Sequence, residues 1–135
     1  MNTAIKTLNI SKSYPGVQAN SNVSVQIQES TIHAIVGENG AGKSTLMKIL
    51  YGMTKPDEGE IEIFDQNASM SSPKDAINFG IGMVHQHFML AKNLTVLENV
   101  ILGIDRPSFK NLGLKKYKKL IEEVMSLYSL DIDLD

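Results

Sequence analysis

The sequence predicts an α/β protein with a phosphate-binding P-loop core. Residues 37–45 match the pattern Gly-x4-Gly-Lys-Ser/Thr at every fixed position. The apolar run at residues 32–36 precedes this motif and predicts a buried strand, and residues 46–51 follow it and predict a helix that ends at Gly52. Strand, glycine-rich turn and helix in this order are the setting in which the motif holds phosphate groups.

Two further strands are expected before the motif. Residues 4–14 alternate loosely between apolar and polar side chains and stop at the turn formed by Pro15 and Gly16. Residues 22–28 alternate strictly, which is typical of a half-buried strand.

The segment after the motif contains a strand, a helix and a second short strand. A turn at residues 56–59 leads into an alternating run at 60–64, which predicts a strand. Ser72 as N-cap and a proline at the first helical position predict a helix over residues 73–79. Residues 81–84 predict a short strand.

Two helices are expected in the C-terminal part. Thr95, followed three residues later by Glu98, is a capping box that opens a helix to about Leu102. The last helix is the most regular, because apolar side chains recur at helical spacing on one face. These side chains are Leu114, Tyr117, Ile121, Val124, Met125 and Tyr128. The acidic residues 131–135 are expected to form an exposed linker.

The composition fits one ordinary globular domain. Of 135 residues, 42% are hydrophobic and 21% charged, and a net charge of −2 gives no reason to expect nucleic-acid binding. The absence of cysteine excludes disulfides and cysteine chemistry and fits a reducing compartment. The N-terminus lacks the apolar core of a secretion signal, and no apolar run approaches the roughly 20 residues needed to cross a bilayer. We therefore expect a cytoplasmic protein whose membrane role, if any, is peripheral.

The residue types of the motif fit a polyphosphate. Backbone N–H groups of such a loop and the positive end of the following helix favour an anion. Its glycines allow backbone angles and a close approach that a Cβ would prevent. Lys43 is expected to reach the β- and γ-phosphates, and the Ser44 hydroxyl to bind Mg²⁺. The expected nucleotide-binding residues of the loop are Gly37, Asn39, Gly40, Ala41, Gly42, Lys43, Ser44 and Thr45.

Four landmarks in one order resemble the ATP-binding cassette family, the nucleotide-binding subunits of ABC transporters. They are Tyr14 at the end of the first strand, the P-loop at 37–45, the turn and strand at 56–61, and residues 82–90 around Gln86. The resemblance implies a partial P-loop NTPase core of the ABC ATPase type with an N-terminal antiparallel β subdomain. It covers residues 1–135 as the N-terminal portion of one ATP-binding domain.

The resemblance also implies roles for single residues, with ATP and Mg²⁺ as the ligands. Tyr14 would stack on the adenine ring, a contact that any aromatic face offers a base, and Val17 would belong to the same cofactor site. Gln86 falls where the family places its Q-loop glutamine, whose side-chain oxygen ligates Mg²⁺ or holds the attacking water. Lys43 and Gln86 are therefore the expected catalytic residues, and Ser44 and Gln86 the expected Mg²⁺ ligands.

Residues 84–90 and 93–103 look like those of cassettes that serve bacterial importers of simple sugars and nucleosides. In this family the region after the Q-loop contacts the transmembrane subunits, so Phe88, Met89 and Leu90 are either docking residues or buried loop anchors. The implied partners are permease subunits, a second nucleotide-binding domain and, indirectly, a solute-binding protein. The implied location is the inner face of the cell membrane.

Several parts of the family pattern are missing. The sequence has no Leu-Ser-Gly-Gly signature, no apolar strand ending in Asp-Glu (the Walker B pair) and no switch histidine after it. Hydrolysis needs such carboxylates to fix Mg²⁺ and to position water. We therefore expect part of a longer ATPase, a part that binds nucleotide but hydrolyses it poorly by itself.

Three other functions stay open. A soluble cassette ATPase of translation or DNA repair is disfavoured by the apolar residues after Gln86. A non-catalytic nucleotide-binding regulator would need the chain to act as it stands. A nucleotide kinase is disfavoured because no acceptor-binding arginines follow the P-loop.

Overall fold

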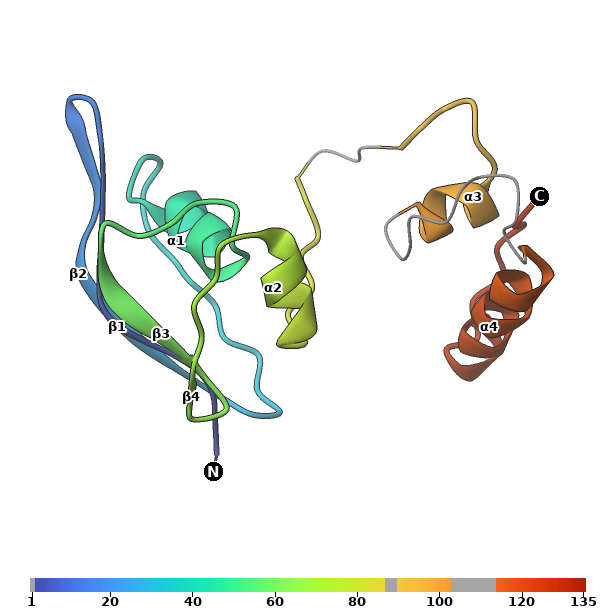
Figure 1. Cartoon of the computed structure of the whole chain (residues 1–135), viewed down its shortest axis with the longest axis horizontal. Helices are drawn as coiled ribbons and strands as arrows, with labels where there is room; N and C mark the ends of the chain where they lie inside the picture. Colours follow the sequence, from blue (N-terminus) through green and yellow to red (C-terminus); the bar gives the residue numbers. More distant parts are fainter. Residues whose placement is uncertain (1, 87–89, 103–113) are drawn as a thin grey trace. The chain divides into compact units, whose positions relative to one another are not determined.

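The computed structural model describes residues 2–86, 90–102 and 114–135 (Figure 1). These residues form two compact units, of which the first ends at Val84 and the second begins at His85. Within the described ranges no helix has both the length and the apolar character needed to cross a bilayer.

A four-stranded antiparallel sheet forms one layer of the first unit. β1 (Thr3–Tyr14) lies between β2 (Val17–Gln28) and β3 (Glu58–Ile63), and β4 (Gln66–Asn67) borders β3. The predicted N-terminal antiparallel subdomain is thereby confirmed, with β2 beginning earlier than its alternating pattern does.

Strand β4 is not among the strands that the sequence predicts. Phe64 and Asp65 connect it to β3, with φ angles of 47° and 60°. Positive φ at two central residues is the geometry of the tight hairpin turn whose twist matches paired strands. Neither residue is glycine, so the usual sequence signal for this turn is missing.

Two helices cover one face of this sheet (Figure 1). α1 (Lys43–Leu50) begins inside the P-loop motif, and α2 (Pro73–Asn78) begins directly after the predicted N-cap Ser72. The core between the helices and the sheet is almost entirely aliphatic. It consists of Ile10, Leu46, Ile49, Leu50, Ile61, Ile63, Ala68, Met70 and Ala76.

Two predicted strands are wrong. Residues 32–36 pair with no strand among the described residues, and the side chains of Ile32 and Val36 are 103% and 90% exposed. Residues 81–84 also contain no strand. Ile35 still packs against the core, so part of the apolar pattern is used. A strand needs a neighbour that accepts and donates its backbone hydrogen bonds, and apolar composition cannot supply one.

The second unit contains α3 (Val96–Ile101) and α4 (Leu114–Leu127). The predicted capping box at the start of α3 is confirmed. Thr95 Oγ1 accepts a hydrogen bond from the Glu98 amide at 3.2 Å, and Glu98 Oε2 accepts one from the Thr95 amide at 2.9 Å. Together these bonds satisfy two backbone donors at a helix end that otherwise lack partners.

The buried face of α4 is narrower than predicted. Tyr117, Ile121 and Met125 pack against the buried cluster of Leu97, Ile101 and Leu134. The other predicted members of the face are exposed: Leu114 at 42%, Val124 at 46% and Tyr128 at 69%.

The acidic C-terminal residues are not an exposed linker throughout, which corrects the sequence prediction. Leu134 is 5% exposed, and its carbonyl accepts a hydrogen bond from the Leu97 amide at 3.0 Å. Asp135 forms an ion pair with Lys118 of α4 at 2.7 Å. Because Leu134 alternates with aspartates, the sequence pattern gives no sign that its side chain packs with those of α3 and α4.

Asp75 in the first turn of α2 gives the fold a testable pH dependence. Its Oδ2 accepts hydrogen bonds from the Ser71 amide and the Ser72 hydroxyl, both at 3.0 Å, and chiefly the first of these lowers the pKa of Asp75. Because the pKa of Asp75 is lower in the folded state, its ionised carboxylate stabilises the fold when the pH is above the ordinary pKa of about 3.9. This stabilisation is lost as the pH falls through the lowered pKa of the folded state.

We expect Asp75→Asn to reduce the unfolding free energy at pH 7, measured by chemical denaturation. The difference from wild type should shrink in acid; a gap that stays constant to pH 2 would contradict this.

Candidate functional site

The P-loop forms a solvent-exposed turn that ends in the first residues of α1. Gly40 and Gly42 have φ angles of 86° and 83°, in the left-handed region that favours glycine. The Ala41 amide donates to the Glu38 carbonyl at 3.2 Å and closes the turn. Because α1 begins at Lys43, its first amides lie at the helix end that attracts anions.

Lys43 ties the two ends of the loop together. Its Nζ donates to the carbonyl oxygens of Gly37 and Glu38, both at 2.7 Å. A lysine ammonium has three donors. Two hold the loop in shape, and a third remains for an anion placed against the loop.

Strand β2 fixes the P-loop from the side. A Cβ on Gly42 would lie 2.0 Å from the Ala19 carbonyl oxygen and 2.7 Å from Asn20 Nδ2, so only glycine fits against β2. Asn20 Nδ2 also donates to the Gly42 carbonyl at 3.3 Å. Asn20 is only 6% exposed, and its Oδ1 has no partner among the described residues.

Asn20 is a site residue that the sequence alone does not identify. Asparagines and serines are common along β2, and nothing in their spacing marks the one that lies beside the P-loop. A contact between residues 22 positions apart becomes visible only once β2 and α1 are placed together.

The predicted base-binding residues flank the turn between β1 and β2. Tyr14 and Val17 are paired across this turn and are 42% and 60% exposed. Val17 lies three residues before Asn20 on the same strand, a separation of about 10 Å. Asn20 contacts the P-loop, so the turn between β1 and β2 and the loop lie toward the same end of the first unit (Figure 1).

The structure does not bring together the two predicted Mg²⁺ ligands within one unit. Ser44 is exposed at the start of α1 in the first unit, and Gln86 is exposed in the second unit. Their joint action on a metal ion remains a prediction.

The residues present fit a nucleotide with a polyphosphate tail. The loop is open to solvent, and the Lys43 ammonium contacts the carbonyl of Gly37 at its start. β2 lies so close to Gly42 that no Cβ fits between them. The chemistry of the loop, backbone amides with one ammonium and one adjacent hydroxyl, is that of a phosphate site.

The second unit contains an apolar groove of about 430 Å³. Its lining is Leu90, Ala91, Lys92, Leu94, Val96, Asn99 and Val100. The Asn99 side chain holds the segment that forms the groove. Its Nδ2 donates to the carbonyl oxygens of Ala91, Leu94 and Thr95 at 2.9–3.2 Å, and its Oδ1 accepts from the Ala91 backbone amide at 2.9 Å. Leu90 is 66% exposed. Of the predicted docking residues, Phe88 and Met89 lie outside the described residues.

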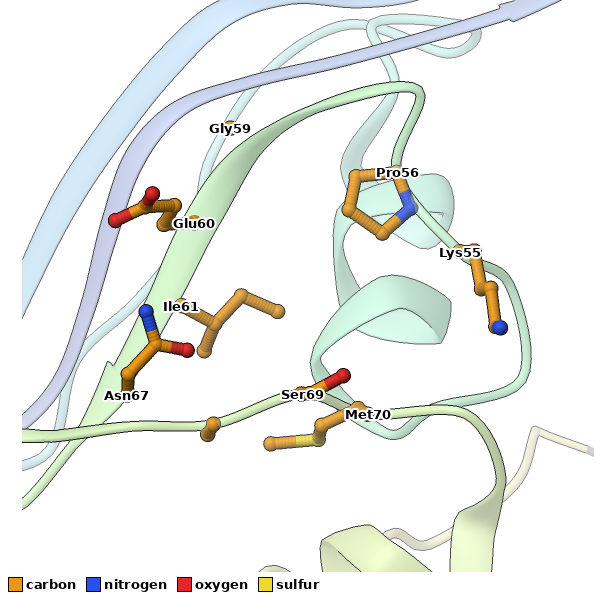
Figure 2. A pocket seen from close by; sticks show the side chains of 9 residues that line it. Lys55, Pro56, Gly59, Glu60, Ile61, Asn67, Ser69 and Met70 are labelled. Carbon is orange, nitrogen blue, oxygen red and sulfur yellow. The ribbon is translucent and has the colours of Figure 1, made fainter.

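A shallow pocket of about 210 Å³ lies between β3, β4 and the segment after α1 (Figure 2). Lys55, Pro56, Glu60, Asn67 and Met70 are among its lining residues, and none of the predicted nucleotide-binding residues is. The predicted nucleotide-binding residues therefore lie outside this pocket.

The sequence is similar to ATP-binding proteins of membrane importers. The family model described as "ABC transporter" matches residues 20–134. The chain is 44% identical over 132 residues to the guanosine import ATP-binding protein NupO of Bacillus subtilis (strain 168). It is 45% identical over 133 residues to the nucleoside import ATP-binding protein NupA of Lactococcus lactis subsp. cremoris (strain MG1363). Each alignment covers 98% of this chain and 26% of the relative, so the chain spans about a quarter of the length of these relatives.

Another relative is named for the import of a sugar, and solved structures share the fold. The chain is 55% identical over 100 residues to the glucose import ATP-binding protein TsgD13 of Haloferax volcanii, covering 74% of this chain and 18% of the relative. A nucleotide-free ATP-binding cassette from an ABC transporter superposes with a TM-score of 0.75 at 28% identity, over 95% of this chain and 55% of that one. The ADP conformation of the cassette MJ1267 gives 0.76 at 27% identity, over 96% and 55%.

Proposed function

Because the chain belongs to the ATP-binding cassette family of ABC transporters, we propose that it is the N-terminal portion of the ATP-binding subunit of an importer. The proposed cargo is a nucleoside or a simple sugar, since relatives named for guanosine, nucleoside and glucose import are 44–55% identical. The observation that supports nucleotide binding most directly is the P-loop geometry, in which α1 begins inside the motif and Lys43 closes the loop.

The proposed ligand is ATP with Mg²⁺. The loop amides and Lys43 hold the phosphates, and the exposed hydroxyl of Ser44 and the side-chain oxygen of Gln86 are the proposed metal ligands. When bound, Mg²⁺ neutralises charge on the phosphate oxygens. Tyr14 and Val17 form the proposed base-binding end of the site, and Gln86 orients the attacking water.

Residues 1–135 are proposed to bind ATP without efficient hydrolysis. They contain no Asp-Glu pair after an apolar strand and no Leu-Ser-Gly-Gly segment. In the proposed ATPase these groups come from outside this range and from a second nucleotide-binding domain.

The proposed docking surface for permease subunits is the apolar groove of the second unit. Leu90, Val96 and Val100 are exposed apolar side chains of this groove, at 66%, 40% and 44%. Exposed apolar surface of this kind marks interaction sites. The subunit would then lie on the inner face of the cell membrane, bound through the permease, with the solute-binding protein acting indirectly.

The test of ATP binding is calorimetry of the full-length protein with Mg-ATP, comparing wild type with Lys43→Ala. Loss of a charged hydrogen bond costs about 1.5–3 kcal/mol, so we expect the affinity to fall at least about tenfold. Lys48→Ala, on the exposed side of the same helix, is the matched control and should bind as wild type does. Equal affinities of wild type and Lys43→Ala would refute the proposed role of the loop.

A further inference from the structure

A lysine lies over the ring of the proposed base-binding tyrosine. The Lys12 Nζ atom is 5.8 Å from the centroid of the Tyr14 ring. The two residues are two positions apart on β1, so their side chains share one face of the strand. The Lys12 side chain is only 16% exposed, and a cation that is partly removed from water binds an aromatic face more strongly.

Asp57 holds this lysine in place. Its Oδ1 accepts from Lys12 Nζ at 2.6 Å, and its Oδ2 accepts from the Ser13 amide at 2.7 Å. The Asp57 amide donates to the Ser11 carbonyl at 2.9 Å. These bonds attach the turn before β3 to the last residues of β1. The hydrogen bond from Lys12 is the main cause of the lowered pKa of Asp57.

We propose that Lys12 and Asp57 are positioning residues for Tyr14, which leave one face of its ring for the base of a bound nucleotide. The inference rests on the proposed function, because Tyr14 must first be the base-binding residue. Tyr14 is 42% exposed and ends its strand beside a turn, so an unsupported ring would lose rotamer freedom when a base binds. Lys12 orders the Tyr14 ring before a base binds, so less rotamer freedom is lost on binding. Lys12 lies on one face of the ring, and the base would use the other.

A purely structural ion pair is the alternative, and the chain offers a matched example. Lys6 of β1 pairs with Glu62 of β3 at 2.9 Å, and both are partly exposed. Lys6 is eight residues from Tyr14 along the strand, about 26 Å. Both lysine pairs join β1 to the segment around β3, but of these two lysines it is Lys12 that lies over the Tyr14 ring.

The experiment compares two ligands on the full-length protein by calorimetry. Mg-ATP uses the phosphate and base ends of the site, and inorganic tripolyphosphate uses only the phosphate end. Lys12→Met should lower ATP affinity roughly two- to fivefold, the size of a partly exposed cation–π contact, and leave tripolyphosphate affinity unchanged. Asp57→Asn should act in the same direction. Lys12→Arg should restore ATP affinity, because a guanidinium keeps the charge and pairs with a carboxylate. Lys6→Met should change neither affinity.

Tyr14→Ala separates failure of this inference from failure of the proposed function. We expect it to lower ATP affinity roughly fivefold or more with tripolyphosphate unchanged, and Lys12→Met should add nothing in its background. Suppose that Tyr14→Ala lowers ATP affinity as expected, but Lys12→Met has no effect or lowers both affinities equally. The positioning role of Lys12 is then refuted, and the base-binding role of Tyr14 is not. If Tyr14→Ala leaves the ratio of the two affinities unchanged, the base-binding assignment itself is refuted.

Discussion

Gly42→Ala is expected to destabilise the protein by about 3 kcal/mol or more and to abolish measurable ATP binding. Two costs add. An alanine at a φ of 83° costs roughly 1–2 kcal/mol through its left-handed backbone. Its Cβ would also lie 2.0 Å from the Ala19 carbonyl oxygen, which is backbone of β2 and cannot rotate away. Either β2 or the P-loop must move, and the loop carries the proposed phosphate-binding amides.

Gly40→Ala is the control that separates these costs. Gly40 has a φ of 86°, almost the same as Gly42, but none of the described atoms lies within 4 Å of the point that a Cβ on Gly40 would occupy. Gly40→Ala should therefore lose only the unfolding free energy that a left-handed alanine costs, about 1–2 kcal/mol. Chemical denaturation of the two variants measures the difference. Equal losses would mean that β2 does not press against the loop as described.

The sequence predicts most of this fold wherever local chemistry decides the structure. The capping box of Thr95 and Glu98, the N-cap position of Ser72 and the alternation in β1 and β2 depend on neighbours within a few residues, and all are confirmed. The helix predicted at residues 46–51 is also confirmed, but α1 begins three residues earlier, at Lys43, and ends at Leu50.

What the sequence could not predict depends on partners far along the chain. Residues 32–36 have the composition of a strand but no strand beside them in the described part of the chain. Leu134 lies between aspartates, and its burial follows only from where α3 and α4 meet. The same holds at the site: Asn20 contacts Gly42, and Asp57 reaches Lys12 across 45 positions. A single polar residue is not part of a periodic pattern, so the sequence alone cannot reveal such contacts.

Ile49→Ala is expected to cost about 2–5 kcal/mol of unfolding free energy. Ile49 is 0% exposed in α1 and lies in the core between this helix and the sheet. Truncation removes three methyl or methylene carbons and leaves a cavity that packed neighbours fill only partly. Ile49→Val, which keeps the branched shape, should cost only about 0.5–1.5 kcal/mol.

A helical isoleucine outside the core gives the comparison for this variant. Ile77 in α2 is 55% exposed, so Ile77→Ala should cost much less than Ile49→Ala, near the roughly 0.5 kcal/mol typical of surface sites. Chemical denaturation followed by circular dichroism measures all three variants. Because Ile49 supports the helix that begins at Lys43, the fold and the proposed phosphate site depend on the same packing. Saturating Mg-ATP should still raise the melting temperature of Ile49→Ala, since a ligand that binds only the folded state stabilises whatever fraction folds. Equal losses for Ile49→Ala and Ile77→Ala would show that α1 is not anchored through Ile49.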